Sequence, residues 1–160
     1  MTSNQQAPGR RGRRPGTPGR LSRWIQHKAN SRANRKIRRG KGTMMGMDLL
    51  ILNTVGRESG EPRETPVAWF TDGDDAKLVV ASGGGALHPD WYLNLMASPD
   101  RASVELPGRE PTPVTPHQLD GADREQAWQR IAEANPRIAK YQSKSKREYP
   151  VIRLTPTVSA

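Results

Sequence analysis

A glycine-containing turn in this chain has the residue types and spacing to bind an anion. The turn follows an apolar run and leads into an extended segment, the whole stretch being Leu49–Pro66. Its polar and small residues are Gly56, Arg57, Ser59, Gly60 and Arg63. Guanidinium groups, a hydroxyl and the backbone N–H groups of such a turn can all donate hydrogen bonds to a phosphate. We therefore expect a β-hairpin whose turn holds a phosphate group.

Three consecutive glycines at 83–85 form a second feature that suits an anion. They end the strand-like segment 76–82 and precede Pro89 and Asp90, which are typical of a helix start. Backbone can approach a ligand closely at such a place, and the helix dipole points its positive end at the ligand. Glycine serves a strand-to-helix turn more often by its conformational freedom than by binding, so this signal is weak by itself.

Several other chemistries are excluded. The chain has no cysteine, which excludes disulfides, thiolate metal sites and a thiol nucleophile. His27, His88 and His117 have no metal-ligand spacing, so we expect no metal. No segment approaches the roughly 18 apolar residues of a membrane-spanning helix, and the start does not resemble a secretory signal. We expect a cytoplasmic protein that is at most peripheral at the inner face of the cell membrane.

The positive charge belongs to one end of the chain. Residues 1–41 contain 13 of the 26 Lys and Arg residues and no Asp or Glu, which gives them a formal charge of +13. Residues 42–160 contain the other 13 basic residues and all 16 acidic ones, which gives −3. We therefore divide the chain into a basic N-terminal arm, 1–41, and a folded domain, 42–160. The first 20 residues are too polar to bury a core, so we expect them to be disordered.

The second half of the arm could form a short basic amphipathic helix. The segment 21–39 lacks Pro and Gly, and Leu21, Trp24 and Ile25 lie at helical spacing. One interpretation is a solvated or linker helix that packs Trp24 and Ile25 on the domain. Another is contact with an anionic membrane surface, and a less favoured one is nucleic-acid binding.

The folded part reads as an antiparallel sheet with a few helices. The segments 48–54, 63–71 and 76–82 suggest three strands in a meander, joined by short turns. A helix is expected at 90–98, a strand at 102–106 and a proline-rich edge strand or irregular rim at 109–119. Two helices at 121–134 and 136–143 precede a closing strand at 149–154. This order suits an α+β fold, with a small antiparallel barrel or curved sheet and flanking helices.

Three blocks of the sequence resemble successive signatures of the deazaflavin-dependent nitroreductase family. They are GRESGEPRETP at 56–66, ASGGGALHPDWYLNL at 81–95 and YQSKSKREYPVIRL at 141–154. The likeness covers about residues 42–156. It implies a split β-barrel of the FMN-binding split-barrel-like class, in an oxidoreductase of actinobacteria. It further implies that reduced coenzyme F-420, an 8-hydroxy-5-deazaflavin, passes a hydride to an electron-poor acceptor such as a quinone or a nitroaromatic.

The resemblance also implies which residues bind the cofactor and the substrate. The cofactor-binding positions would be Thr54, Gly56, Arg57, Ser59, Gly60, Arg63, Thr65, Pro66, Ala81, Ser82, Gly84, Gly85, Trp91 and Asn94. Ser82 and Tyr141 would face the substrate as the catalytic residues. Hydride transfer is cofactor chemistry, so these two would orient the reactants and need not act as acid or base.

The chain departs from the family at two positions where many relatives carry a positive charge. Many relatives have lysine where this chain has Glu58 and Gly83, and the loop between Ala86 and His88 is one residue shorter. A close charge contact is worth on the order of a kcal/mol at a partly exposed site, so cofactor affinity could fall by about one to two orders of magnitude. Alternatively, Glu58 points to solvent and pairs with Arg57 or Arg63, which would weaken the phosphate site indirectly.

Two alternatives to this function stay open. One is a barrel of the same family that has weakened or lost cofactor use and acts as a binding protein. The other is a split-barrel reductase that uses FMN, since the fold suits both cofactors. A homodimer is a further expectation, because split-barrel proteins often pair.

Overall fold

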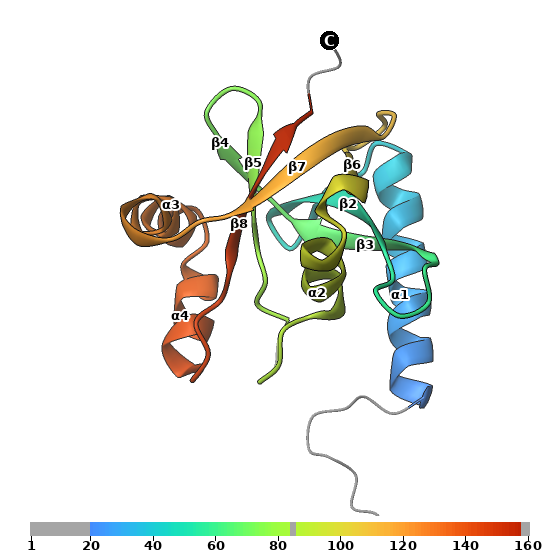
Figure 1. Ribbon diagram of the computed structural model, residues 1–160, viewed down its shortest axis with the longest axis horizontal. Coiled ribbons are helices and arrows are strands. Elements are labelled where there is room, and N and C mark those ends of the chain that lie inside the picture. Colours follow the sequence, from blue (N-terminus) through green and yellow to red (C-terminus); the bar gives the residue numbers. More distant parts are fainter. Residues whose placement is uncertain (1–19, 84–85, 158–160) are drawn as a thin grey trace, which may run out of the picture.

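A curled antiparallel sheet organises the computed structural model, which describes residues 20–83 and 86–157, with side chains from Ile25 onward. The strands are β1 (Thr43–Met44), β2 (Met47–Val55), β3 (Pro62–Ala68), β4 (Phe70–Asp72), β5 (Ala76–Val80), β6 (Ser103–Glu105), β7 (Thr112–Gln118) and β8 (Val151–Pro156). The helices are α1 (Arg20–Arg38), α2 (Asp90–Ala97), α3 (Gly121–Ala134) and α4 (Pro136–Lys144), with a 3-10 turn at Pro99–Arg101. Figure 1 shows the helices arranged around the sheet.

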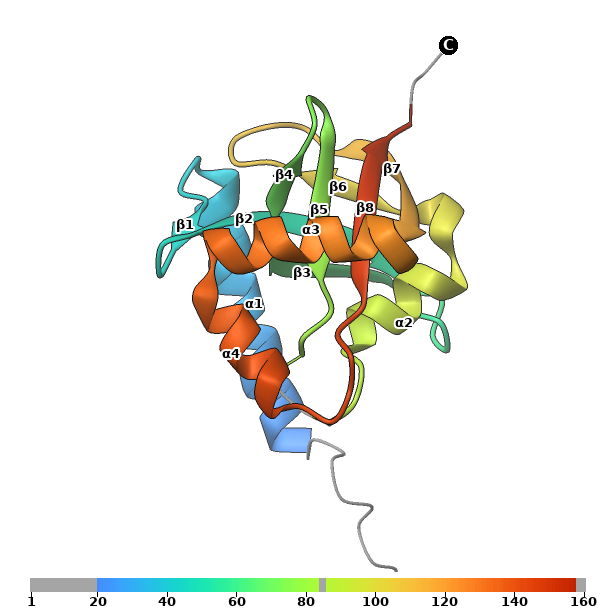
Figure 2. The ribbon, with the colours of Figure 1, turned by 90° about the vertical axis from the view of Figure 1, so that its left-hand side faces the viewer.

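The sheet curls into a half-barrel. The strand order is β1-β2-β6-β7-β8-β5-β4. Strand β3 pairs with β2 on the side opposite to β6, and every pairing is antiparallel. Figure 2 shows β5 and β8 running across the direction of β2 and β3, so the sheet curls back over its own inner face. This confirms the expected α+β split-barrel fold. No helix in the described part of the chain is long and apolar enough to cross a membrane.

The continuous apolar run of β2 is explained by cover on both of its faces. Leu50 and Leu52 point into the main core, where they join residues of β5, β8 and α2. Leu49 and Ile51 point to the opposite face and form a small cluster with Ile37 of α1. Because alternate residues enter two different clusters, all four are buried and the usual polar alternation of a strand is lost.

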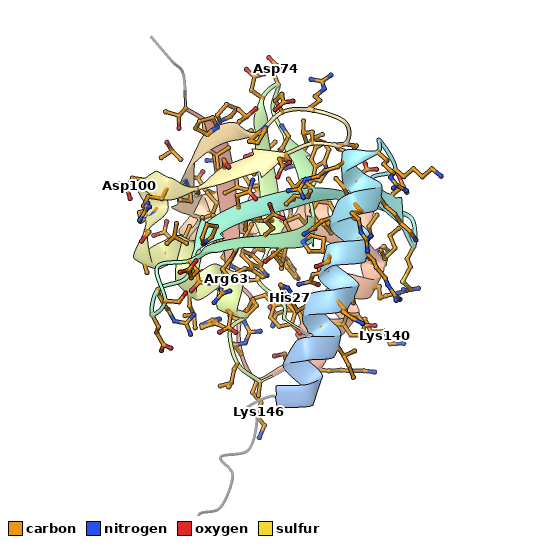
Figure 3. The ribbon with its side chains drawn as sticks, turned by 90° about the vertical axis from the view of Figure 1, so that its right-hand side faces the viewer. His27, Arg63, Asp74, Asp100, Lys140 and Lys146 are labelled. Carbon is orange, nitrogen blue, oxygen red and sulfur yellow. The ribbon has the colours of Figure 1, made fainter. Side chains whose placement is uncertain are left out.

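Helix α1 confirms the helix expected at 21–39, and its last turns are part of the packed structure. Ala33, Asn34 and Ile37 are buried, while Ile25 is 56% exposed, so the apolar contact lies nearer the C-terminal end than Ile25 suggested. Figure 3 looks onto α1, which lies over β2 and β3. The expected disorder of the first 20 residues is wrong at Arg20, which begins α1. Residues 1–19 and the side chain of Trp24 lie outside the described residues. The division after residue 41 marks a change of charge, and it stays a prediction as a domain boundary.

The expected single strand at 63–71 is interrupted at Trp69. Its first part, β3, pairs with β2, whereas the short β4 that follows pairs with β5. At the break the Trp69 N–H donates to the carbonyl oxygen of Asp48 at 3.1 Å. The expected three-strand meander is therefore two hairpins, and the interruption is where the chain passes from one part of the barrel to the other.

The proline-rich segment 109–119 was expected to be an edge strand or an irregular rim, and this was wrong. Its strand β7 pairs with β6 at Thr112 and Pro113 and with β8 along its whole remaining length. Pro116 is tolerated for two reasons. First, the pairing of β7 with β6 ends before Pro116. Second, N–H groups point to alternate sides along a strand, and the N–H of Leu119, three residues later, bonds β8. An N–H at position 116 would therefore point away from β8, so its absence breaks no bond of that pairing.

Candidate functional site

A cleft of about 770 Å³ lies between the β5–α2 connection and the α4–β8 connection. Its lining residues are Ser82, Ala86, Tyr141, Lys144, Ser145, Lys146, Arg147 and Tyr149. Figure 2 shows the two connections meeting at the end of the molecule where α4 finishes. The structure thus brings together Ser82 and Tyr141, the two residues expected to face the substrate. The volume lies in the range of clefts that bind cofactors and other small molecules.

The cleft is cationic and partly aromatic. Lys144 and Lys146 are exposed at its rim, Arg147 is half-buried, and the lining residues include no Asp or Glu. In Figure 3, Lys146 lies at the opposite end of the molecule from Asp74, which belongs to an acidic turn. The cleft residues therefore favour a ligand with negative charge, and the exposed Tyr141 offers ring surface to a flat group.

Arg147 connects the two walls of the cleft. Its Nη1 donates to the carbonyl oxygen of Ala81 at 3.0 Å and its Nη2 to that of Ser82 at 2.6 Å. Nη1 also lies 3.0 Å from Nδ1 of His88. A guanidinium group can only donate, so this His88 nitrogen accepts the hydrogen bond. Ala81, predicted as a cofactor contact, is fully buried and here offers its carbonyl oxygen to Arg147.

The turn between β2 and β3 is a tight hydrogen-bonded loop. The Gly60 N–H donates to the Gly56 carbonyl oxygen at 2.8 Å, and the Gly56 N–H donates to that of Glu61 at 2.8 Å. The Ser59 hydroxyl accepts from the Glu61 N–H at 3.1 Å and from Nη2 of Arg63 at 3.3 Å. A Cβ at position 56 would lie 2.5 Å from Ser59 Oγ, so only glycine lets Ser59 approach in this way. Ser59 and Arg63, both predicted phosphate ligands, are therefore held side by side.

Arg57 is engaged by α2. Its backbone N–H and its Nη1 both donate to Oδ1 of Asn94, at 3.1 and 2.9 Å, and its Nη2 forms an ion pair with Asp90 at 3.2 Å. Arg57 and Asn94 were both predicted to contact the cofactor, and the structure does bring them together. They bind each other in this conformation, so an incoming phosphate would compete with Asp90 for the guanidinium group.

The remaining predicted cofactor residues that the structure describes lie on β2, β3 and α2. Thr54 is buried, and its hydroxyl finds no hydrogen-bond partner among the described residues. Thr65 and Pro66 lie on β3 opposite Leu52 and Ile51 of β2. Trp91 is half-buried and packs on the main core. Gly84 and Gly85 lie outside the described residues.

Glu58 does not form the pairs that the sequence suggested. Its side chain is exposed, and no ion pair among the described residues involves it. Arg57 pairs with Asp90, and Arg63 donates to Ser59. Glu58 therefore occupies neither arginine among the described contacts.

Sequence reasoning missed the residues that build the α4–β8 wall. Lys144, Ser145, Lys146, Arg147 and Tyr149 all lie in the third block that carried the family resemblance, from which only Tyr141 was selected. The basic residues of that block, clustered within four positions, were the available signal. Ala81 and Ser82, the backbone partners of Arg147, lie about 65 residues earlier, and no local pattern joins the two segments.

Comparison with known proteins identifies related sequences. A family model for the F420H(2)-dependent quinone reductases matches residues 24–156. An F420H(2)-dependent quinone reductase of Mycobacterium tuberculosis is 33% identical over 148 residues, which is 84% of this chain and 97% of the relative.

Two solved structures extend the comparison to the fold. One, an F420-H2 dependent reductase called FDR-A, has 34% identity and a TM-score of 0.58 over 66% of this chain and 92% of its own. The other, a domain-swapped dimer, has 29% identity and a TM-score of 0.59 over 84% of this chain and 98% of its own. The family match includes every strand of the sheet and both walls of the cleft. It also confirms the resemblance to F-420-dependent reductases that the three sequence blocks predicted, and the chain belongs to the F420H(2)-dependent quinone reductase family.

Proposed function

We propose that this protein is an oxidoreductase that transfers a hydride from reduced coenzyme F-420 to an electron-poor acceptor such as a quinone or a nitroaromatic. The observation that carries the proposal is the cationic cleft of about 770 Å³ that Ser82 and Tyr141 both line. Its rim lysines and the exposed Tyr141 suit a flat, negatively charged ring system. Membership of a family of F420H(2)-dependent quinone reductases supports the same reaction.

The donors available in the structure fit the anionic groups of this coenzyme. Arg63 and Ser59 lie together at the exposed turn, where the guanidinium group and the hydroxyl would bind the phosphate. Arg57 would join them if it exchanged Asp90 for the phosphate. The buried Thr54 hydroxyl has no partner among the described residues and is a further donor near the end of β2, just before the turn.

The protein would act by holding and orienting the reactants. When bound, the reduced deazaflavin supplies the hydride. The hydroxyl groups of Ser82 and Tyr141 would donate hydrogen bonds to the acceptor oxygen on which negative charge develops. Lys144 and Lys146 would make the potential of the cleft more positive and stabilise the same charge.

A titration of the reduced coenzyme tests this function. Fluorescence quenching would measure binding to the wild type, to Arg63→Ala and to the control Arg109→Ala, which changes an exposed arginine of the β6–β7 loop. We expect Arg63→Ala to weaken binding roughly tenfold, because it loses a charge-assisted hydrogen bond. We also expect the control to bind like the wild type, and a quinone to oxidise the coenzyme only when the protein is present. Absence of binding by the wild type at high protein concentration would refute the proposal.

The absorbance of the purified protein distinguishes the FMN alternative. FMN often remains bound during purification, and it would give a yellow protein with a flavin spectrum. We propose coenzyme F-420 because the family is named for its use. A stoichiometric flavin spectrum, with no quenching of reduced F-420, would favour FMN. A colourless protein that binds neither would favour the barrel that has lost cofactor use.

We also propose two partners. The first is an anionic membrane surface, bound through the exposed basic residues of α1, which would keep a cytoplasmic protein at the inner face of the membrane. The described turns of α1 support this with Arg32, Arg35 and Lys36, all exposed, and the helix contains no acidic residue. The second is another copy of this chain, because a related solved structure is a domain-swapped dimer. Light scattering during gel filtration would report the mass of the particle.

A further inference from the structure

Gln142, the residue after Tyr141 in α4, ties the following loop to the helix. Its Nε2 donates to the carbonyl oxygen of Arg147 at 2.9 Å, and its Oε1 accepts from the backbone N–H of Tyr149 at 2.7 Å. One side-chain amide thus uses both its donor and its acceptor on the backbone of the same short segment. The path from Tyr141 to the α4–β8 connection is fixed by these two bonds.

Arg147 continues this path across the cleft. Its two terminal nitrogens donate to the carbonyl oxygens of Ala81 and Ser82, at 3.0 and 2.6 Å. The Ala81 N–H donates to the Pro150 carbonyl oxygen at 2.9 Å, so both backbone polar groups of Ala81 bind the segment 147–150. The start of the β5–α2 connection, which carries Ser82, is therefore attached to the wall that carries Tyr141.

A guanidinium group suits this place better than an ammonium group would. Its separate nitrogens reach two consecutive carbonyl oxygens in fixed directions, whereas the single nitrogen of lysine has no such fork. Its plane also lies against the ring of Tyr149, with 4.9 Å between the guanidinium carbon and the ring centre. Arg147 is half-buried, so water competes less for these bonds than it would at an exposed site.

We propose that Gln142 and Arg147 together form a brace that sets the separation of Ser82 and Tyr141, and that both are positioning residues for hydride transfer. The inference rests on the proposed function for its catalytic part. Neither residue contacts the β2–β3 turn in the bonds described above, so the brace acts on the placement of the reactants and not on phosphate binding. A displacement of about 1 Å between reacting groups can cost on the order of a hundredfold in rate.

Steady-state kinetics on conservative variants test the catalytic part. Arg147→Lys keeps the charge and loses the fork, and Gln142→Asn keeps the amide on a shorter side chain. We expect each to lower kcat roughly 10- to 100-fold, while KM for the reduced coenzyme changes less than about twofold. Arg109→Lys, the same substitution at an exposed site, should keep the wild-type kcat. A wild-type kcat in both brace variants, or an equal loss in the control, would overturn the proposal.

The double variant tests whether the two residues act as one unit. If two residues support the same connection, a change in either one already removes most of the contribution of that connection to kcat. We therefore expect the double variant to be about as slow as the slower single variant. A fall in kcat equal to the product of the two single effects would show two independent contributions and contradict a single brace.

Amide hydrogen exchange tests the brace without any activity. We expect the amides of Tyr149 and Ala81 to exchange at least about tenfold faster in Arg147→Lys and Gln142→Asn, because the bonds at this connection are lost or loosened. Amides of β2, such as that of Leu50, should exchange as in the wild type. If the wild type showed no F-420 activity but the exchange changed in this way, the proposed function would fail and the structural brace would stand. Unchanged exchange at Tyr149 and Ala81 would overturn the brace itself.

Discussion

Glu58 adds a negative charge to the turn that we propose as the phosphate site. It lies between Arg57 and Ser59 and is exposed, so it repels an anion without occupying a donor. Replacement by lysine changes the local charge by two units, and each close contact at a partly exposed site is worth on the order of 1 kcal/mol. We expect Glu58→Lys to tighten binding of reduced F-420 roughly tenfold or more, as measured by fluorescence titration.

A distant charge reversal is the control for this prediction. Glu110 is exposed in the β6–β7 loop, and Glu110→Lys changes the net charge by the same amount. Its effect should be small at about 0.15 M salt, where charges more than roughly 8 Å apart are screened. Equal tightening by both variants would show a general charge effect, and no tightening by Glu58→Lys would place the phosphate elsewhere.

Single residues of the site were predictable only where a motif carried them. Ser82 and Tyr141 lie in two of the three family blocks, and the structure places both in one cleft. The contact of Arg57 with Asp90 was not predictable, because it depends on how α2 approaches the hairpin. The same holds for Arg147, whose partners are backbone carbonyl oxygens that any residue could supply.

At the scale of elements, an ion-pair network attaches α1 to the sheet. Arg38 donates to both carboxylate oxygens of Glu105, at 3.1 and 3.0 Å, and to Glu64 at 2.7 Å. Glu105 is only 7% exposed, and Asn53 donates to it at 3.0 Å. The hydrogen bonds from Arg38 lower the pKa of Glu105, burial opposes this, and Asn53 adds to the lowering. The network therefore stabilises the ionised carboxylate.

This network predicts a pH-dependent stability. A carboxyl whose pKa is lowered by folding contributes stability above its unfolded pKa of about 4.3, and loses it as the pH falls through the folded pKa. We expect Arg38→Ala to lower the free energy of unfolding by about 2 kcal/mol at pH 7, because a buried carboxylate loses its partner. The loss should shrink between about pH 5 and pH 3. Urea unfolding at several pH values would measure it.

An arginine on the exposed side of the same helix is the matched control. Arg32→Ala removes the same side chain without touching Glu105 or Glu64. It should change the free energy of unfolding by less than about 0.5 kcal/mol at every pH. A pH-independent loss in Arg38→Ala would contradict the ionic origin and indicate lost packing alone.

The elements were largely predictable because their patterns are local, and the exceptions are tertiary. The unbroken apolar run of β2 predicted a strand, and in the structure Ile37 of α1 and the main core cover its two faces. The interruption at Trp69 and the internal position of β7 depend on how the sheet curls. A proline indicates that an N–H is missing, but it does not show whether a neighbouring strand lies on that side.

At the scale of the whole molecule, the packing of α1 predicts which truncations fold. Every contact that we describe lies within residues 20–157, so a chain beginning at residue 20 retains them all. A chain beginning at residue 42 loses Ile37, whose removal costs roughly 2–5 kcal/mol, and the partner of Glu105. Since small domains have about 5–15 kcal/mol in total, most of the stability would be lost.

Thermal unfolding measures both truncations. We expect the chain from residue 20 to keep its Tm within a few degrees, and the chain from residue 42 to show a greatly lowered Tm or no cooperative transition. An unchanged Tm for the shorter chain would show that α1 is only an appendage and would support the boundary at 41. Removal of the whole arm would then be a valid way to study its partners.

If α1 belongs to the fold, its removal would unfold the protein, so the proposed binding of α1 to a membrane surface must be tested by substitutions on the exposed side of the helix. The three exposed residues Arg32, Arg35 and Lys36 can be replaced together by glutamine while Ile37 and Arg38 are kept. Each basic residue near an anionic bilayer contributes about 1 kcal/mol, so we expect the triple variant to bind phosphatidylserine-containing vesicles about 100-fold more weakly at low salt. The control replaces three exposed arginines outside α1, namely Arg101, Arg109 and Arg137. Co-sedimentation with vesicles would decide: equal weakening in both variants would indicate a net-charge effect, and no binding by the wild type would exclude the membrane surface as the partner of α1.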